Sequence, residues 1–339
     1  MSPRDTLLLE EERADVDGAN LDGGDLDGVE LEGGVESYDG NYRALTTFNS
    51  PFQLCFYNTT PNALPLALRM ATRHSESLFR WVWEANRGNP VHENATFTFG
   101  ANGNLLLADI DGRVTWQTNT ANKGVVGFKL LPNGNMVLHS SKGNFVWQSF
   151  DSPTDTILVG QYLRAESVIK QLVSRASERD NKDGPYSLLM EPKVLSLYYK
   201  SRNSPSPTLY FVSPSDLVFV QEGTLENVTL HSTPETDEGY AYDLGLQYYV
   251  ANPFNDGNRI LARPKYNRTL SFLRLGINGN LRIYTYYDKV DWHAWEVTYT
   301  LFDRDSTESE CQLPERCGEF GLCDNNQCVA CPMSNGLLG

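Results

Sequence analysis

The sequence predicts an all-β fold in which one three-stranded unit is repeated, and three observations support that prediction. A tryptophan motif recurs at Trp83, Trp116 and Trp147, at spacings of 33 and 31 residues. An Asn-Gly-Asn tripeptide followed by apolar residues recurs between these tryptophans, at 102–104 and 133–135. Helical periodicity over roughly ten residues is scarce, whereas Gly, Asn, Pro and Thr recur throughout. Short units that cannot bury a face alone are expected to close around a shared axis.

Each unit is predicted to run strand, turn, strand, turn and strand. The first turn is Asn-Gly, two residues that adopt positive φ at low cost. A second turn follows at Asp111–Gly112 in one unit and at Lys142–Gly143 in the next, and the last strand ends in tryptophan. Trp81 stands two residues before Trp83, so both are expected on one face of the same strand. Three such sheets predict a three-fold β domain with Trp, Leu and Phe on its axis.

A second β-rich region follows the polar stretch 161–184, which is predicted to be a connector. Apolar runs recur there with turn signals between them, as in the first region. A further Asn-Gly-Asn lies at 278–280 and is followed by Trp292 and Trp295. The second region is therefore predicted to be a diverged copy of the first.

Charge is concentrated in the first forty residues. The chain has 28 basic and 43 acidic residues, and residues 1–40 hold 13 of the acidic and 2 of the basic ones. Residues 1–37 include short Asp- and Gly-rich repeats with one central apolar side chain each, which predicts a disordered acidic leader. The nearly balanced remainder lacks the basic face that nucleic-acid binding requires. No apolar run approaches the roughly 18–20 residues of a membrane span.

Cysteine spacing predicts a disulfide-rich segment at 303–339. Large apolar residues are few there, so covalent cross-links must replace a core. A zinc site would use Cys328 and Cys331, but a second pair at matching spacing is missing, which favours disulfides over a metal. The cysteines are Cys311, Cys317, Cys323, Cys328 and Cys331, with Cys55 alone far upstream.

Four Asn-x-Ser/Thr acceptors accompany the cysteines. The predicted glycosylation sites are Asn58, Asn94, Asn227 and Asn267. Together with the cysteine usage they predict an extracellular, secreted glycoprotein.

Signatures of catalysis and of metal or cofactor binding are not found in the sequence. The five histidines form no ligand pattern, and neither a Gly-x-Ser-x-Gly elbow nor a phosphate-binding Gly-Lys-Ser/Thr loop occurs. Asp109 and Asp111 suggest a carboxylate pair for glycoside hydrolysis, but acidic residues are also ordinary at β-turns. A non-catalytic protein without a cofactor or a metal is predicted.

The Trp-bearing Asn-Gly-Asn repeats, the stretch Asp151-Ser-Pro-Thr-Asp-Thr156 and the spacing from Cys311 to Cys323 resemble the plant bulb-type, mannose-binding lectin family. More specifically, residues 38–339 resemble epidermis-specific secreted glycoproteins, S-locus glycoproteins and the extracellular part of S-domain receptor kinases. This resemblance implies tandem three-fold β-prism domains and an EGF-like segment, with no match to the PAN module that follows in those proteins. The implied parts are a leader at 1–37, a bulb-type lectin domain at 38–160, a second lectin-like domain at 161–302 and the EGF-like cluster at 303–339.

The resemblance also implies a sugar site with the pattern Gln-x-Asp-x-Asn-x-Val-x-Tyr, whose polar residues bind sugar hydroxyls. No repeat of this chain keeps the whole pattern, so the mannose sites are predicted to be degenerate. The candidate sugar-binding positions are Asn102, Asn104, Asn133, Asn135, Val137, Asn278, Asn280 and Tyr284. Further candidates for stacking on sugar rings, with core packing as the alternative, are Trp81, Trp83, Trp292 and Trp295.

For the cysteine cluster, the resemblance implies two disulfides. They pair Cys311 with Cys323 and Cys317 with Cys328. Cys55 and Cys331 would then remain. Cys55 is expected either as a buried free thiol or as a partner of the C-terminal segment, and in the second case a bond between Cys55 and Cys331 is predicted.

The predicted function is that of a secreted, cell-wall-associated plant lectin-like glycoprotein that binds cell-wall glycans or assembles as a homo-oligomer. Alternatives are a structural, filament-forming surface protein without sugar binding, and a wall-polysaccharide hydrolase or hydrolase inhibitor. The nearly neutral body favours neutral glycans or self-association over charged polymers.

Overall fold

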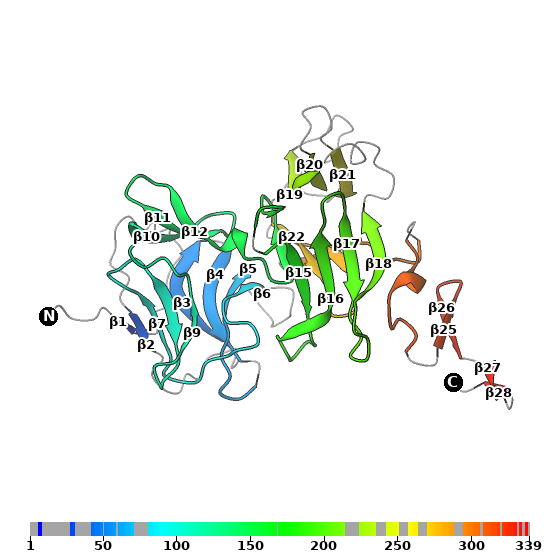
Figure 1. Cartoon of the computed structure of the whole chain (residues 1–339), viewed down its shortest axis with the longest axis horizontal. Helices are drawn as coiled ribbons and strands as arrows, with labels where there is room; N and C mark the ends of the chain where they lie inside the picture. Colours follow the sequence, from blue (N-terminus) through cyan, green and yellow to red (C-terminus); the bar gives the residue numbers. More distant parts are fainter. Residues whose placement is uncertain are drawn as a thin grey trace. The chain divides into compact units, whose positions relative to one another are not determined.

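Figure 1 shows the computed structural model of the chain, in which regular structure is almost entirely β-strand. It describes residues 6–8, 28–30, 42–49, 51–58, 60–70, 81–167, 169–213, 224–234, 242–250, 257–263, 270–287, 294–305, 308–318, 321–330, 332–333 and 336–337. Within these residues there is no α-helix, and the helical segments are the short 3₁₀ turns η2 (Ser149–Asp151) and η4 (Glu310–Gln312). The predicted all-β class is confirmed.

The first of two compact units comprises residues 1–152 and 178–182. Its three sheets have the strand orders β3-β4-β5-β6, β1-β2-β7-β8-β9 and β10-β11-β12. Apart from the β1–β2 pair, neighbouring strands are antiparallel, as short strands joined by tight turns require. The bounds are β1 Thr6–Leu8, β2 Gly28–Glu30, β3 Tyr42–Asn49, β4 Phe52–Tyr57, β5 Leu66–Met70, β6 Trp81–Glu84, β7 Thr96–Phe99, β8 Leu105–Ala108, β9 Val114–Gln117, β10 Val125–Leu130, β11 Met136–Ser140 and β12 Phe145–Gln148.

The second unit comprises residues 153–177 and 183–339, and it repeats the three-sheet plan. Its four-stranded sheets have the orders β13-β22-β23-β24, β14-β19-β20-β21 and β15-β16-β17-β18. The bounds are β13 Thr156–Leu158, β14 Tyr162–Arg164, β15 Gln171–Arg175, β16 Asp183–Met190, β17 Leu195–Tyr199, β18 Thr208–Ser213, β19 Leu225–Pro234, β20 Tyr242–Val250, β21 Gly257–Ala262, β22 Ser271–Leu275, β23 Leu281–Tyr287, β24 Ala294–Thr300, β25 Gly321–Asp324, β26 Gln327–Ala330, β27 Pro332–Met333 and β28 Gly336–Leu337. The second region is thus a second three-sheet domain, as the sequence predicts.

The axis of the first unit is filled by the three repeated tryptophans. The ring centroids of Trp83, Trp116 and Trp147 lie 5.8, 5.8 and 6.3 Å apart, and every pair is edge-to-face. This arrangement places the positive edge of one ring on the negative face of the next. Trp83 also donates from Nε1 to the carbonyl of Ser152 at 2.9 Å. The predicted tryptophan-lined axis is confirmed.

A β-bulge in the last hairpin of each sheet decides which side chains reach the axis. In the third sheet of the first unit, Leu138 pairs with Trp147, whereas the next residue, His139, pairs with Phe145. Successive residues of β11 face opposite sides of the sheet, so Trp147 lies on the inner face and Phe145 on the outer one.

The same bulge corrects the expectation that Trp81 and Trp83 share one strand face. Leu68 pairs with Trp83 and Arg69 pairs with Trp81, with the register shift between them. The extra residue in β6 breaks the two-residue alternation, so Trp81 points to the outer face while Trp83 joins the axis. Trp81 stacks there on Tyr57, with ring centroids 4.3 Å apart.

The units divide the chain differently from the predicted domain boundaries. The change between units falls after Ser152, earlier than residue 160, because β13 pairs with β22 of the second unit. The connector predicted at 161–184 contains the strands β14 and β15, and its residues 178–182 belong to the first unit. Of the acidic leader, only 6–8 and 28–30 lie within the described residues. They form β1 and β2, and β2 pairs with β7.

The cysteine-rich segment of the second unit carries two disulfides. Cys311 is bonded to Cys323 and Cys317 to Cys328, the pairing that the resemblance implies. Cys323 and Cys328 also face each other across the β25–β26 hairpin. The segment therefore holds its shape through covalent links and two short hairpins, β25–β26 and β27–β28.

Cys55 stands apart from this cluster, in the centre of β4. It is a fully buried thiol packed in a cluster with Tyr57, Ala67 and Trp81, and its Sγ lies 3.7 Å from the Gln53 carbonyl. Of the two expected states of Cys55, the structure has the buried thiol, and the predicted disulfide is not formed. The expected partner, residue 331, lies outside the described residues.

Candidate glycan-binding face

The second asparagine of each Asn-Gly-Asn turn is used inside the protein. Asn280 is 1% exposed, its Nδ2 donates to the Phe302 carbonyl at 2.8 Å and its Oδ1 accepts the Phe302 N–H at 3.1 Å. Asn104 and Asn135 are also buried, and each donates from Nδ2 to a glutamine of the last strand in its own hairpin, at 3.0 and 2.9 Å. These amides tie the turn to the end of the sheet.

The other predicted sugar-binding positions are also engaged in turns or buried. Asn102, Asn133 and Asn278 are exposed, but the Oδ1 of each accepts the backbone N–H two residues later, at 3.0, 3.1 and 3.2 Å. This is the local bond with which asparagine stabilises a turn. Val137 is 0% exposed and Tyr284 is 7% exposed. The structure therefore distributes these residues over three hairpins and gives them structural bonds.

Replacing Asn280 by alanine tests this assignment. We expect the free energy of unfolding to fall by about 1–3 kcal/mol, because the buried N–H and C=O of Phe302 would lose their partners. Asn278→Ala, at the exposed position of the same turn, should cost less than about 1 kcal/mol. Urea unfolding measures both. Weaker glycan binding by Asn280→Ala at unchanged stability would contradict the structural assignment.

The outer face of sheet β10-β11-β12 combines an exposed aromatic ring with polar groups. We call it the outer β10–β12 face. Register places Gly127, His139 and Phe145 in one row across the sheet, and Lys129, Val137 and Gln148 in the next. Phe145 is 52% exposed and His139 is half-buried beside it. A Cβ at Gly127 would lie 2.7 Å from His139 Nε2, so glycine provides the space for the imidazole ring.

Polar groups flank this aromatic pair. Gln148 accepts from Asn135 at 2.9 Å through Oε1 and donates from Nε2 to Asp151 Oδ2 at 3.0 Å. Asp151 and Lys129 are both exposed. An aromatic surface next to an amide, a carboxylate and an ammonium group is suited to a sugar ring, which presents apolar C–H faces and hydroxyl edges.

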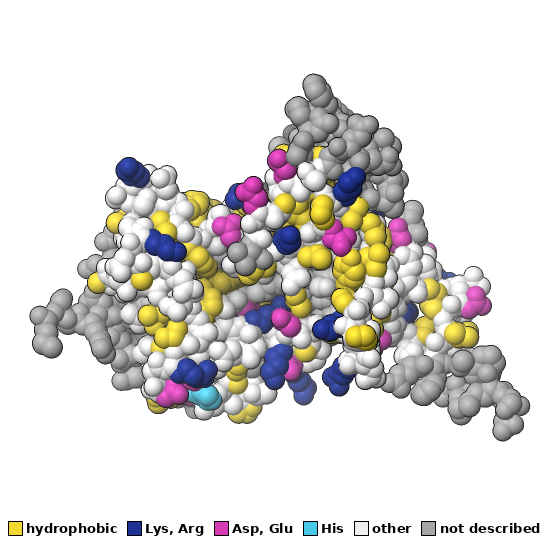
Figure 2. Space-filling model, viewed as in Figure 1, with side chains coloured by type: hydrophobic (Ala, Val, Ile, Leu, Met, Phe, Trp, Pro, Cys, Tyr) yellow, Lys and Arg dark blue, Asp and Glu magenta, His cyan; other side chains and the backbone are white. Residues whose placement is uncertain are grey.

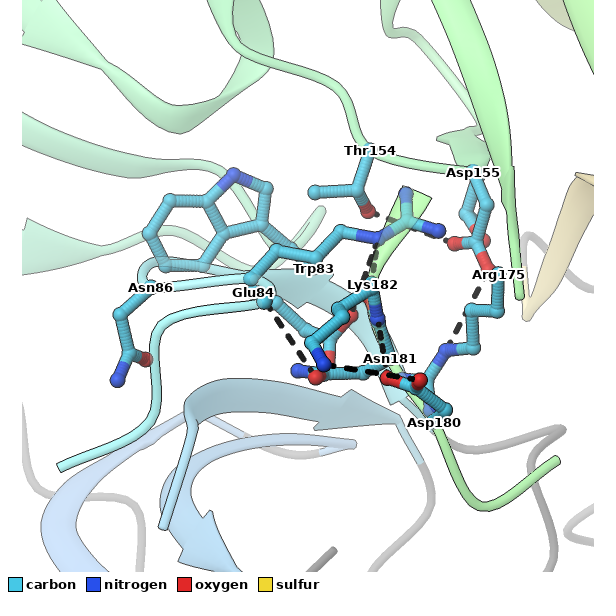
Figure 3. Close-up of polar contacts among 12 residues, drawn as sticks. Trp83, Glu84, Asn86, Thr154, Asp155, Arg175, Asp180, Asn181 and Lys182 are labelled. Atoms are coloured by element: carbon cyan, nitrogen blue, oxygen red, sulfur yellow. Dashed lines mark hydrogen bonds and ion pairs between the residues drawn. The ribbon is translucent and has the colours of Figure 1, made fainter. Parts of the chain in front are cut away.

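The outer face of the first sheet, in contrast, is closed by a segment of the same unit. Glu84 is 4% exposed and accepts hydrogen bonds at Oε1 from Tyr57 Oη and, at 3.1 Å, from Asn181 Nδ2. Arg87 Nε donates to the Asn181 carbonyl at 2.7 Å. Figure 3 shows Glu84 and Asn181 facing each other. Residues 178–182 thus cover the end of β6 on this face.

A third polar cluster surrounds Asp109 in the turn between β8 and β9. Asp109 Oδ1 accepts the backbone N–H groups of His92 and Ile110, both at 3.0 Å. Its Oδ2 lies 2.8 Å from His92 Nδ1 and 3.1 Å from Arg113 Nη2. Burial opposes ionisation of Asp109, but the hydrogen bonds from His92 and Ile110 outweigh it and hold the pKa of this carboxyl below its usual value. An ionised, fully bonded carboxylate anchors the turn and is not poised as a catalytic acid.

This depressed pKa predicts how the stability of the first unit depends on pH. The carboxylate form is favoured in the folded state, so its contribution is complete above the unfolded pKa of about 4 and is lost as pH falls through the lower folded pKa. Asp109→Asn should therefore lower the free energy of unfolding at pH 7, and the difference from the parent should shrink below about pH 4. Urea unfolding of both proteins across acidic pH measures this. A difference that grows on acidification would contradict the prediction.

The remaining aromatic candidates are mostly packed into the sheets. Trp81 is 8% exposed beneath Tyr57, and Trp83 is on the axis. Trp295 is half-buried and packs edge-on against Phe272, with centroids 5.4 Å apart. Residue 292 lies outside the described residues.

The predicted glycosylation acceptors occupy different environments. Asn94 is exposed at a turn with φ +63°. Asn227 is half-buried in β19, and Asn58 is half-buried just after β4. Position 267 lies outside the described residues. Exposed asparagine at a turn is the environment in which an attached glycan meets least obstruction.

Comparison with known proteins places this architecture in a family. A family model described as D-mannose binding lectin matches residues 80–179. The epidermis-specific secreted glycoprotein EP1 of Daucus carota is 58% identical over 315 residues, which cover 89% of this chain and 80% of the carrot protein. The chain belongs to this EP1-like, bulb-type lectin-domain family. A second relative, EP1-like glycoprotein 4 of Arabidopsis thaliana, is 50% identical to this chain over 309 residues, which cover 89% of this chain and 67% of that protein.

A weaker likeness exists to a solved lectin structure. The native fetuin-binding Scilla campanulata agglutinin, described as a two-domain lectin, covers 80% of this EP1-like chain and 97% of its own, at 15% identity and a TM-score of 0.27. In the described part of the chain, no helix has the length and apolarity needed to span a membrane. Nor do three or more His, Cys, Asp or Glu side chains gather there in a metal-binding group.

Sequence reasoning missed Phe145 and His139 as surface residues. Phe145 stands two residues before Trp147, and strict alternation would place both on the inner face. The signal that could have located it is the repeat itself: Val114 stands two residues before Trp116 and is also exposed, at 47%. Repeated exposure at this position is the consequence of the repeated bulge.

Proposed function

We propose that this EP1-like protein is a secreted, cell-wall-associated glycoprotein that acts by binding neutral glycans on its outer β10–β12 face. The observation that carries the proposal is Phe145, an aromatic ring 52% exposed beside His139 and within reach of the Gln148–Asp151 pair. An exposed aromatic ring beside polar groups presents both an apolar face and hydrogen-bonding partners to a ligand. Stacking of a pyranose on the ring would cover it, while the amide and carboxylate receive hydroxyl groups.

The cellular context of the proposal rests on covalent features and on relatives. Two disulfides and the exposed Asn-x-Ser/Thr acceptor Asn94 suit an oxidising, extracellular compartment. The carrot relative is named a secreted glycoprotein. Glycosylation of Asn94, with Asn58, Asn227 and Asn267 as further acceptors, belongs to the same proposal. It is checked by glycopeptide mass spectrometry of the plant-expressed protein.

The degenerate mannose positions are not the binding residues in this proposal. Their buried amides already have partners in the hairpins, so a bound sugar would have to break these bonds. Mannose-selective binding is therefore not expected, in contrast to what the family description suggests.

Phe145→Ala is the decisive variant. We expect it to weaken binding to cell-wall oligosaccharides on a glycan array, and in calorimetric titration of the best binder, by about tenfold. Val114→Ala removes the exposed apolar residue at the equivalent position of the neighbouring sheet and should leave binding unchanged. Mannose binding that survives Phe145→Ala would assign recognition to the turns instead.

Self-association is the second candidate function, and a repeated feature favours it. In five of the six sheets, the outer residue that stands two positions before the axis residue is exposed and apolar; in the sixth, Trp81 is 8% exposed. The five exposed residues are Val114, Phe145, Leu209, Ile260 and Val297. Light scattering over a range of concentrations tests it. If the mean particle mass rises with concentration, if Phe145→Ala reduces this rise, and if the parent binds no glycan, then assembly is the role of this face.

The enzyme alternative has its own test. It would be supported if the protein hydrolyses wall polysaccharide and if replacing a single carboxylate abolishes this activity.

A further inference from the structure

Two tyrosines of the second unit pair across neighbouring strands. Tyr186 of β16 lies directly opposite Tyr199 of β17, so both side chains extend from the same face of the sheet. Their ring centroids are 5.2 Å apart, and the ring planes are tilted by 36°. The pair lies beside the axis of this unit, whose positions follow the same bulge as in the first unit and are Phe211, Ala262 and Tyr299.

A single carboxylate accepts hydrogen bonds from both phenols. Tyr199 donates from Oη to Glu315 Oε1. Tyr186 Oη lies 3.5 Å from Glu315 Oε2 and 3.3 Å from the carbonyl of Pro314. Glu315 has a φ of +60°, a conformation that residues other than glycine seldom adopt. Its turn thus holds the carboxylate at both hydroxyl groups, which brings the oxygen-bearing edges of the two rings together.

Both phenols are protonated near neutral pH. The hydrogen bond to Glu315 raises the pKa of Tyr199, and burial, followed by the charge of Glu315, raises the pKa of Tyr186. A phenol that loses an electron becomes far more acidic, so its proton moves to a nearby base. Glu315 is exposed and hydrogen-bonded to both hydroxyl groups, and its carboxylate is therefore placed to accept that proton.

An oxidant reaches the pair through Tyr199. Tyr199 is half-buried at the end of β17, whereas Tyr186 is 3% exposed. Figure 2 shows side chains of β17 and β18 at the surface of the molecule. Tyr186 passes an electron to oxidised Tyr199 through the ring contact, and Tyr199 is then available for a second oxidation.

We propose that Tyr186 and Tyr199, with Glu315 as proton acceptor, form a dityrosine cross-link in the presence of hydrogen peroxide and a haem peroxidase. Each phenol gives up one electron and one proton and becomes a phenoxyl radical, whose unpaired electron lies partly on the carbons ortho to the oxygen. The two radicals join through one ortho carbon of each ring, and the hydrogen on each of these carbons moves to the phenol oxygen. The peroxide takes up the two electrons and two protons and leaves as two water molecules.

The test is oxidation of the intact chain by hydrogen peroxide and a haem peroxidase, at a low protein concentration that suppresses coupling between molecules. Trypsin places Tyr186 in the peptide 183–193 and Tyr199 in the peptide 194–200, because each of these peptides follows a lysine and ends in one. We expect dityrosine fluorescence, together with a cross-linked pair of these two peptides that has lost two hydrogen atoms. Mass spectrometry of the digest measures this pair.

Substitution by phenylalanine keeps the rings and removes the reactive hydroxyl groups. Tyr186→Phe and Tyr199→Phe should each abolish the cross-linked pair. Tyr198→Phe is the matched control, because Tyr198 belongs to the same peptide and also donates to a carboxylate, Glu191 Oε1 at 2.6 Å. Tyr198 points to the opposite face of the sheet, and no tyrosine ring contacts it within the described residues, so this variant should cross-link as the parent does.

Glu315→Gln tests the proton acceptor. It keeps the shape of the side chain, but an amide is a far weaker base, so the rate of cross-linking should fall by at least about tenfold. Glu310→Gln changes a carboxylate of the same segment that is bonded to Arg316, and it should leave the rate unchanged. The proposal is overturned if the cross-linked pair is absent, if it survives Tyr186→Phe, or if Glu315→Gln reacts as fast as the parent.

Discussion

Trp83→Ala is expected to lower the free energy of unfolding of the first unit by about 3–5 kcal/mol. Trp83 is 6% exposed and contacts both other tryptophans of the axis. Its removal would leave a cavity at the one point where all three sheets meet, and alanine cannot replace the hydrogen bond to the Ser152 carbonyl. A total stability of 5–15 kcal/mol is usual for a domain, so this loss would remove much of it.

Urea unfolding followed by near-ultraviolet circular dichroism measures this change, because the three indoles dominate the aromatic signal of the axis. Val114→Ala is the control: it shortens an exposed side chain two residues before Trp116 and should change stability by no more than about 0.5 kcal/mol. A loss below about 1 kcal/mol for Trp83→Ala would mean that the neighbouring side chains collapse into the space.

The tryptophan axis was predictable because two independent periodicities agree. Trp83, Trp116 and Trp147 recur at nearly the interval of the Asn-Gly-Asn turns. Each of the three sheets therefore contributes one tryptophan to the axis at the same height. The turns themselves required glycine: Gly103 and Gly134 have φ of +80° and +84°, a region that other residues rarely adopt. Local turn chemistry and the repeat length together determine the sheets.

The outer faces were not predictable, because a single extra residue reverses the alternation on which such predictions depend. Neither Phe145 nor Trp81 carries a local mark of the bulge that turns it outward. The closure of β6 by residues 178–182 was equally hidden, since it is a contact between segments almost a hundred residues apart. The second axis was missed for another reason: Ala262 and Tyr299 do not resemble tryptophan, and only the pairing register reveals them as its equivalents.

The Asp151-Ser-Pro-Thr-Asp-Thr156 stretch contributed to the family resemblance without a physical explanation, and the structure supplies one. Asp155 is buried in the second unit between two arginines, with Oδ2 3.6 Å from Arg175 Nε and 3.7 Å from Arg274 Nε. Figure 3 shows Asp155 beside Arg175. Thr156 donates to Asp155 Oδ1 at 2.9 Å and accepts from Arg274 Nε at 3.0 Å. The motif therefore joins β13 to β15 and β22 through charge.

Asp155→Asn should consequently destabilise the second unit by about 3–5 kcal/mol, because it leaves two buried guanidinium groups facing a neutral amide. The shape of the side chain is kept, so the loss reports charge and not packing. Urea unfolding, reading the transition of the second unit, measures it. The matched control is Glu310→Gln, which removes the charge from a partly exposed pair of the same unit, with Arg316 at 2.6 Å, and should cost less than about 1 kcal/mol. Equal effects of the two exchanges would show that the buried arginines find other partners, and the role assigned to the motif would then be wrong.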